Sequence, residues 1–446
     1  MQPRPTTGQI IIYALGQFGW ALASFCVANA LIYFYAPPED VGADFPAFIQ
    51  GGAIFLGLTL IGIIGFGGRI LDGLTDPLIA TYSDRMQSKM GKRKKLMAIS
   101  VLPFALFGFL VFYPISDSLM TNSIWLIFVV IAFYVSFTGY LIPYTALIAE
   151  LGHHQDDRLK ISMFISIAFA LAMICGAQIY GIQESLEQSY TCAEAFQAPV
   201  LAVSMIGLVM MLVPIIFLDE NKYAQQNSES PSLSKAFSRI KGHRNFKYFV
   251  ISDLLYWLAL TFIQLGMVYY VTLLFGMEKS AATSFLELSF VLSFLFYFMI
   301  YYLNKKVGKK WMMISGFMIF IIVFGLIFFM PLLGIPLASM FYLFVVLTAY
   351  ALAVFGVLPN VIIADIVNEE EKRTGQSLSA VFYGARNFMM KIGISLANLL
   401  FPSLLLFGKS LENSTGVKYS VLVAMVFSFL GLFIFLRYRE KELDLT

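Results

Sequence analysis

Residues 142–151 read IPYTALIAEL, and residues 358–367 read LPNVIIADIV. Each stretch has a proline at its second position and an acidic residue near its end. Several matches at nearly one spacing indicate that the second half of the chain repeats the first half in the same orientation. The matched pairs, at offsets of 215 to 217 residues, are Pro143 and Pro359, Glu150 and Asp365, Arg158 and Arg373, and Gly91 and Gly308.

The composition of the chain is typical of a membrane protein. Hydrophobic residues make up 59% of its 446 residues and charged residues only 13%, with a mean hydropathy of +0.79. A soluble domain carries about 25% charged residues, so hydrocarbon must surround most of this chain. The net charge of +3 gives no reason to expect a nucleic-acid partner. Three cysteines and three histidines form no disulfide or metal-site pattern, so we expect no cofactor.

Long apolar runs predict the membrane-spanning helices, because a span needs about 20 predominantly apolar residues. The chain contains twelve such runs, which predict an all-α membrane protein with two six-helix bundles. The bundles are expected at residues 1–218 and 246–446, joined by a polar cytoplasmic linker at residues 219–245. The predicted spans are 8–36, 52–82, 96–115, 122–150, 160–184, 197–218, 246–276, 280–303, 312–332, 337–365, 375–406 and 416–437.

The basic residues predict the orientation, since lysine and arginine collect in cytoplasmic loops. Most of the 30 basic residues lie in loops that share one side of the membrane if the N-terminus is cytoplasmic. Only Lys279, Lys409 and Lys418 fall in loops on the other side. Both termini are therefore predicted to be cytoplasmic. We expect a multi-pass protein of the plasma membrane, specifically a bacterial inner membrane, that functions as a monomer in the lipid bilayer.

Two carboxylates lie inside the second predicted span. Asp72 and Asp76 are four residues apart, which places them on one helical face. Asp72 is about 18 Å from the cytoplasmic edge at 1.5 Å per residue. A charge at this depth costs about 2.5–3.5 kcal/mol and is a functional candidate by default. A cation, a proton or a basic partner must neutralise the pair, and Lys391 on the eleventh span is the first candidate, with Arg386 the second.

Other candidates have weaker support from their positions. Asp84 and Arg85, with the basic run that begins at Gly91, Lys92 and Arg93, are expected to form a cytoplasmic gate. Aromatic and acidic residues within the spans could line a central cavity, although packing is the favoured explanation for each aromatic residue and an interfacial or structural role explains each acidic residue at least equally well. These cavity candidates are Trp20, Tyr140, Tyr144, Asp253, Trp257, Glu287 and Tyr383.

The stretch from Arg69 to Lys95 resembles the glycoside–pentoside–hexuronide:cation symporter family of the major facilitator superfamily. The matching elements are Asp-x3-Asp-Pro, the Asp-Arg pair and the glycine before the basic run. Similar stretches elsewhere are YALGQFGWALA, YYVTLLFG and ADIVNEEEKRTGQ. The resemblance implies a major facilitator fold and a site for Na⁺ or H⁺. On this sequence the implied cation site is Asp72, Thr75, Asp76 and Thr138, with Lys391 as the mid-membrane lysine.

This sequence departs from the sugar-binding members of that family. Ala21 and Leu141 stand where those members place aspartates, and an uncharged residue near Ser166 replaces a basic one. The first hypothesis is therefore cation-coupled symport of a sugar, glycoside or related small organic solute. An amphiphile such as a lysolipid is the alternative substrate, and a non-transporting receptor or structural protein is the alternative of another class. We expect no enzymatic activity, because the sequence contains no catalytic constellation.

Overall fold

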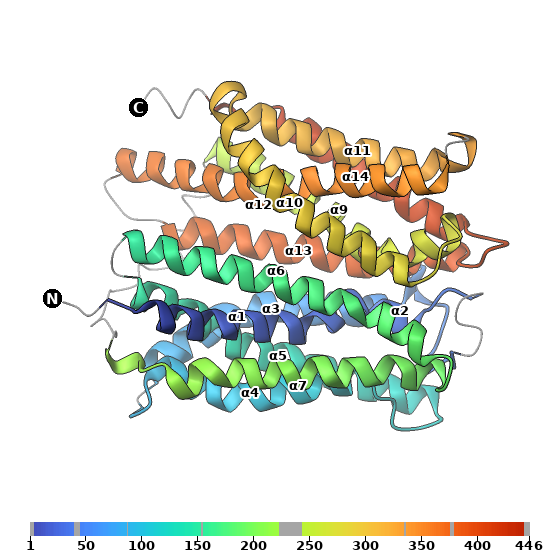
Figure 1. Cartoon of the computed structure of the whole chain (residues 1–446), viewed down its shortest axis with the longest axis horizontal. Coiled ribbons are helices and arrows are strands. Elements are labelled where there is room, and N and C mark those ends of the chain that lie inside the picture. The colour runs from blue at the N-terminus through green and yellow to red at the C-terminus, as the bar shows by residue number, and fades with distance from the viewer. Residues whose placement is uncertain are drawn as a thin grey trace. The chain divides into compact units, whose positions relative to one another are not determined.

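The computed structural model describes residues 4–39, 45–86, 88–152, 155–222, 243–333, 336–374 and 379–440. The chain divides into two compact units, Met1–Ser228 and Glu229–Thr446, and the boundary falls inside the predicted linker. Within each unit the long helices run side by side (Figure 1).

The first unit is built from long helices and one short hairpin. Its order is α1 (Thr7–Asn29), α2 (Leu31–Tyr35), β1 (Ala53–Phe55), β2 (Leu58–Thr59), α3 (Leu60–Arg85), α4 (Lys92–Leu110), α5 (Leu119–Leu151), α6 (Gln155–Leu186), α7 (Cys192–Phe217) and the 3-10 turn η1 (Glu220–Lys222). The two strands pair in an antiparallel manner.

The second unit is helical throughout its described residues. Its order is α9 (Arg244–Tyr269), the π-helical turn η2 (Tyr270–Leu274), α10 (Ser280–Val307), α11 (Lys309–Leu333), α12 (Leu337–Thr374), α13 (Ser379–Leu404), the 3-10 turn η3 (Leu405–Phe407) and α14 (Thr415–Phe435).

Each of the twelve predicted spans coincides with a long helix. Ten helices of the described chain are long and apolar enough to cross a membrane. The other two are α3, which carries Arg69, Asp72 and Asp76, and α4, which begins with four basic residues; these charges lower their hydropathy. The start of the second predicted span was wrong, because residues 52–59 form the hairpin and the segment just before it rather than helix, and α12 continues beyond the predicted end at residue 365 to Thr374.

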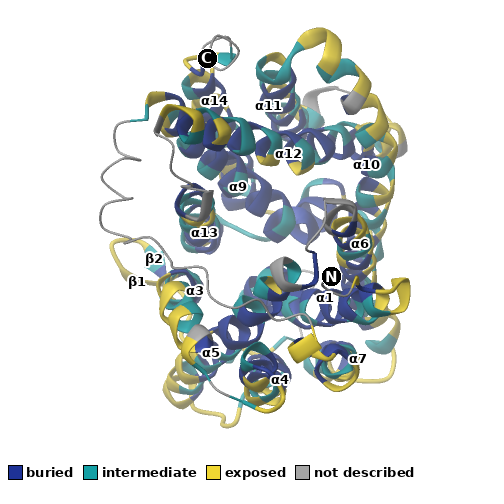
Figure 2. Cartoon of the chain, turned by 90° about the vertical axis from the view of Figure 1, so that its left-hand side faces the viewer, coloured by how far each residue is buried: buried dark blue, intermediate teal, exposed yellow. Residues whose placement is uncertain are grey.

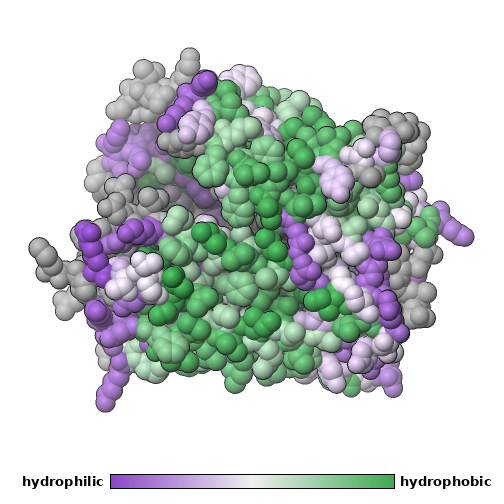
Figure 3. Space-filling model, viewed as in Figure 1, coloured by the Kyte–Doolittle hydropathy of each residue, from purple (hydrophilic) through white to green (hydrophobic). Residues whose placement is uncertain are grey.

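Hydrophobic side chains cover the middle of the helices on the face drawn in Figure 3, and hydrophilic side chains gather toward their ends. The burial colours of Figure 2 show that α4, α5 and α7 each have a buried side and an exposed side. Leu102, Phe128 and Ile206, for example, are 60%, 56% and 46% exposed. Exposed apolar faces of this kind suit contact with lipid, so the fold is that of a multi-pass membrane protein.

Two of the cavity candidates, both tyrosines, are packed between helices, which is the alternative favoured from the sequence for the aromatic residues. Tyr140 and Tyr144 are both 0% exposed. The hydroxyls of Tyr13 and Tyr144 each donate to the other residue's carbonyl, at 2.8 and 2.6 Å, and their rings stack with centroids 4.4 Å apart. The Tyr140 hydroxyl donates to the carbonyl of Met211 at 3.1 Å. Their polar groups are thus satisfied inside the first unit, where they join α5 to α1 and α7.

Candidate cation site and neighbouring ion pairs

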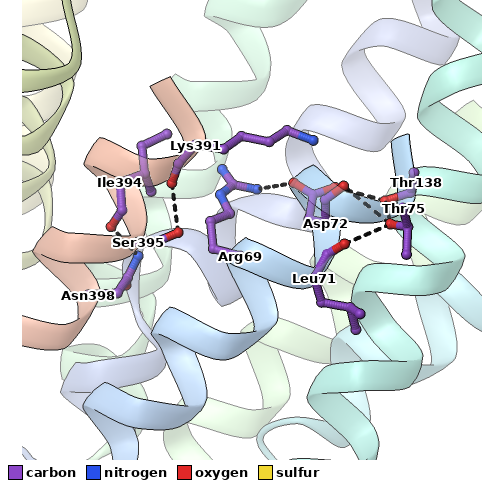
Figure 4. Close-up of polar contacts among 9 residues, drawn as sticks. All are labelled: Arg69, Leu71, Asp72, Thr75, Thr138, Lys391, Ile394, Ser395 and Asn398. Carbon is purple, nitrogen blue, oxygen red and sulfur yellow. Dashed lines mark hydrogen bonds and ion pairs between the residues drawn. The ribbon is translucent and has the colours of Figure 1, made fainter. Parts of the chain in front are cut away.

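Asp72, on α3, is a fully buried carboxylate, with 0% of its surface exposed. The hydroxyl of Thr138, on α5, donates to Asp72 Oδ1 at 2.8 Å, and Arg69 Nη1 lies 3.3 Å from Oδ2 (Figure 4). The Thr75 hydroxyl lies 3.4 Å from that of Thr138 and donates to the carbonyl of Leu71 at 2.9 Å. The structure therefore brings together three of the four residues predicted to form the cation site.

A close approach of α3 and α5 positions these residues. A Cβ atom on Gly68 would lie 2.5 Å from the ring of Tyr134, so only glycine allows this approach. Asp72 follows Gly68 by one helical turn, and Thr138 follows Tyr134 by one turn. Residues four apart share a helix face, so the contact at Gly68 places the Thr138 hydroxyl against the Asp72 carboxylate. The guanidinium of Arg69 also lies over the Tyr134 ring, 5.8 Å from its centroid.

Gly67 and Gly68 allow the effect of the distance between α3 and α5 to be tested. We expect Gly68→Ala to separate α3 from α5 and to weaken cation binding at Asp72. Gly67→Ala is the matched control, because a Cβ there meets nothing within 4 Å and alanine favours a helix by about 1 kcal/mol over glycine. Cation-dependent thermal stabilisation of the purified variants measures both effects. Equal responses of the two variants would show that the helix spacing does not position the site.

Asp76 and Lys391 complete the set expected from the sequence. Asp76 is half-buried, one turn beyond Asp72 on α3. Lys391 is 8% exposed on α13, and the Ser395 hydroxyl donates to its carbonyl at 2.7 Å (Figure 4). Asp72 and Lys391 belong to different units, so charge pairing between them stays a prediction. Within the first unit, Arg69 provides the positive charge that contacts Asp72.

The structure assigns Arg386 a partner that the sequence did not reveal. Arg386 Nε lies 2.9 Å from Asp253 Oδ2, and Nη2 lies 3.3 Å from Oδ1. Arg386 Nη1 also donates to Oδ1 of Asn360 at 2.8 Å. The side chains of Arg386 and Asp253 are only 9% and 1% exposed. This bidentate ion pair links α13 to α9 and, through Asn360, to α12. The expected role of Arg386 as a second charge partner for the carboxylates of α3 stays a prediction.

The remaining cavity candidates lie at half-buried positions. The indole N–H of Trp20 donates to Oε1 of Gln17 at 3.2 Å. Trp257 lies one turn beyond Asp253 on α9, and its indole nitrogen is buried with no hydrogen-bond partner among the described residues. Tyr383 lies on α13 and Glu287 on α10, both half-buried.

The predicted cytoplasmic gate is described only in part. Arg93 Nη1 donates to the Ser83 hydroxyl at 3.2 Å, which connects α4 to the end of α3. Arg85 is exposed and Lys92 is half-buried. The side chain of Asp84 lies outside the described part of the chain, so its expected role in the gate stays a prediction.

A buried glutamate, which sequence reasoning missed, holds the start of α4. The carboxylate of Glu220, 1% exposed, accepts the backbone N–H groups of Arg93 at 3.0 Å and Lys94 at 2.8 Å. The Lys94 amine donates to the carbonyl of Leu218. Gly91, with φ of 102°, leaves the space that the carboxylate fills. A carboxylate at a helix N-terminus is favoured by the helix dipole, and this one fixes the chain after α7 to α4.

The second unit repeats this carboxylate cap. Glu440 accepts the backbone N–H groups of Lys309 at 2.8 Å and Lys310 at 3.1 Å. The Lys310 amine donates to the carbonyl of Leu436 at 2.7 Å, and Gly308 has φ of 88°. The matching glycines were visible in the sequence, but the caps come from chain segments that follow the last helix of each unit. The equivalence of Glu220 and Glu440 confirms the repeat at the level of side-chain contacts.

The profile of a protein family described as MFS/sugar transport protein, in the major facilitator superfamily, matches residues 12–439. The chain belongs to this family. It is a multi-pass membrane transporter with the all-α major facilitator fold, and not an enzyme. The predicted resemblance to glycoside:cation symporters of that superfamily is confirmed.

Several curated relatives of this MFS transporter are also described as symporters or transporters. The uncharacterized symporter sll1374 of Synechocystis sp. is 30% identical over 160 residues, or 34% of this chain and 27% of the relative's own length. The uncharacterized symporter YnaJ of Bacillus subtilis is 23% identical over 88% of this chain and 81% of its own length. The isoprimeverose transporter of Lactiplantibacillus pentosus is 20% identical over 70% of this chain and 62% of its own length.

Solved structures support the same fold. The nucleoside transporter NupG superposes on this MFS transporter with a TM-score of 0.66 at 16% identity, covering 96% of this chain and 98% of NupG. At this identity the similarity concerns the fold and carries no information on the substrate.

Proposed function

We propose that this MFS transporter moves a small organic solute, a sugar or glycoside, together with Na⁺ or H⁺. The observation that carries the proposal is the buried Asp72 carboxylate, which accepts the Thr138 hydroxyl at 2.8 Å beside Thr75. Hard cations are bound by carboxylate, hydroxyl and carbonyl oxygens, and the same carboxylate could instead take up a proton. A charge in this position is costly to bury, and binding of the coupling cation would explain why the carboxylate is present.

The mechanism that we propose is alternating access with both termini in the cytoplasm of a bacterial inner membrane. A cation at Asp72 would compete with Arg69, which contacts Oδ2 at 3.3 Å. Release of Arg69 on cation binding would change the contacts of α3 with the Tyr134 face of α5. A ligand shifts a conformational equilibrium only through such differences in contacts between states.

The alternative substrate is an amphiphile such as a lysolipid. Ala21, where sugar-binding members of the family carry an aspartate, is 0% exposed and offers no side-chain acceptor. A buried methyl group at this position cannot accept a hydrogen bond from a sugar hydroxyl. This observation keeps the amphiphile as a second candidate for the transported solute.

Uptake by proteoliposomes containing the full-length protein tests both proposals. The solutes to compare are isoprimeverose, a phenyl glucuronide and lysophosphatidylcholine, each with a Na⁺ gradient, a proton gradient or neither. We expect one gradient to drive accumulation of at least one sugar, and an ionophore that dissipates this gradient to abolish the accumulation. Uptake that is equal under all three conditions would contradict coupling, and gradient-driven uptake of the lysolipid alone would contradict the sugar assignment.

A further inference from the structure

Three large apolar side chains at the tip of the β1–β2 hairpin remain exposed. Ile54, Phe55 and Leu56 are 47%, 63% and 84% exposed. In Figure 2 strand β1 is coloured as exposed, and the hairpin lies beside α3. No charged residue occurs between positions 45 and 68. Adjacent exposed apolar side chains on an uncharged segment mark a surface that meets an apolar partner.

The conformation of the β1–β2 turn does not explain why a leucine, Leu56, stands at its tip. Phe55 pairs with Leu58, so Leu56 and Gly57 form a two-residue loop, with φ of 50° and 80°. This loop prefers the sequence Asn-Gly, because both residues need positive φ. Among the described residues, Leu56 is the one non-glycine residue with positive φ. A bulky residue in this region is a genuine outlier, so its apolar side chain, and not the turn, accounts for its presence.

The length of α3 is sufficient to bring the hairpin to a membrane surface. β2 runs directly into α3, whose first turn is capped by the Thr59 hydroxyl accepting the N–H of Gly62 at 3.2 Å. The 26 residues of α3 extend about 39 Å at 1.5 Å per residue, which exceeds the hydrocarbon thickness of about 30 Å. With Arg85 at the other surface, the start of α3 and the hairpin before it fall in the headgroup layer.

We propose that Ile54, Phe55 and Leu56 insert into the lipid leaflet opposite the basic loops and anchor the start of α3. Lipid is the partner that surrounds a multi-pass protein at this level. Apolar side chains on an uncharged segment partition into the boundary between headgroups and acyl chains. Because α3 also carries Asp72, the anchor fixes the depth of the candidate cation site in the bilayer. This inference depends on the membrane location of the protein and not on the identity of its solute.

Spin-label accessibility in liposomes tests the proposal. The native cysteines are replaced (Cys26→Ala, Cys175→Ser and Cys192→Ser), and Leu56→Cys carries the label in the full-length protein. The matched controls are Ser189→Cys, in the exposed turn between α6 and α7, and Ile206→Cys, on the exposed apolar face of α7. Collision with oxygen reports lipid, and collision with a water-soluble nickel complex reports water.

We expect the oxygen-to-nickel ratio at position 56 to be several-fold above that at Ser189 and to approach that at Ile206. A ratio equal to that of Ser189 would place the tip in water and contradict the proposal. Protection from both reagents would also contradict it, since the tip would then contact protein, either another part of this chain or a second copy.

A second variant separates insertion from folding of the hairpin. Leu56→Asn creates the preferred Asn-Gly turn, so the hairpin is retained while its most exposed apolar side chain is removed. With the label moved to Ile54→Cys, we expect Leu56→Asn to lower the oxygen-to-nickel ratio toward that of Ser189. An unchanged ratio would show that Leu56 is not part of the anchor.

Discussion

Replacing Asp72 with asparagine is expected to abolish the dependence of solute uptake on the cation gradient. The carboxylate is fully buried and is contacted by Thr138 and Arg69, so its loss leaves the Arg69 guanidinium without this partner. An asparagine at this position carries no negative charge, and two opposite unit charges about 4 Å apart attract each other by about 4 kcal/mol at an effective dielectric constant of about 20; about 1.4 kcal/mol corresponds to a tenfold change in affinity. We therefore expect apparent cation affinity to fall at least about 100-fold, as measured by uptake against cation concentration in proteoliposomes.

Thr138 provides the graded control for this result. Thr138→Ser keeps the hydroxyl that lies 2.8 Å from Asp72 and should retain coupling. Thr138→Val keeps the shape but removes the hydroxyl and should weaken cation affinity by roughly tenfold, since hydrogen bonds to charged groups contribute about 1.5–3 kcal/mol. Coupled uptake that is unchanged in both Asp72→Asn and Thr138→Val would rule out this group as the ion site.

Replacing Asp253 with alanine is expected to cause the largest loss of stability among these variants. Arg386 would then remain buried with only Asn360 as an acceptor in the contacts described. An uncompensated buried charge destabilises a protein by about 3–5 kcal/mol. Thermal unfolding of the purified protein in detergent measures this loss. The double variant Asp253→Asn with Arg386→Gln removes both charges and should recover most of the lost stability.

A more exposed ion pair in the same unit is the matched comparison. Lys309 and Asp365 pair with 28% of each side chain exposed. Exposed ion pairs contribute about 0–1 kcal/mol, so Asp365→Ala should change stability far less than Asp253→Ala. Equal losses in the two variants would mean that burial does not determine the importance of the Asp253–Arg386 pair.

The sequence predicted the helices and the repeat well, because both depend on patterns along the chain. Apolar length determines where a helix can span a bilayer, and all twelve predicted spans coincide with helices. The contact of Asp72 with Thr138 was also expected, although only through the family resemblance. Spacing along α3 alone placed Asp72 and Asp76 on one face without indicating which residue of α5 would meet them.

The missed features depend on contacts between distant segments. Arg386 and Asp253 are 133 residues apart, and no local pattern pairs them. Glu220 lay at the edge of the expected linker, where an isolated acidic residue gives no sign that it caps α4. Tyr140 and Tyr144 were named as cavity candidates because an aromatic residue within a span can face a substrate, although packing was the favoured explanation. Their hydrogen bonds to the backbone of α1 and α7 are set by helix packing, which single-chain periodicity does not specify.

The most direct test of the central claim is cation binding to the purified protein without any solute. A ligand that binds only the folded state stabilises it in proportion to RT ln(1 + [L]/Kd), so the unfolding temperature reports occupancy. Wild-type protein should be stabilised by Na⁺ relative to K⁺, or should show a pH-dependent step if H⁺ is the coupling ion, and Asp72→Asn should lose that response. If wild-type and Asp72→Asn proteins respond identically to Na⁺ and to pH, Asp72 is not the cation site and the proposed coupling is wrong.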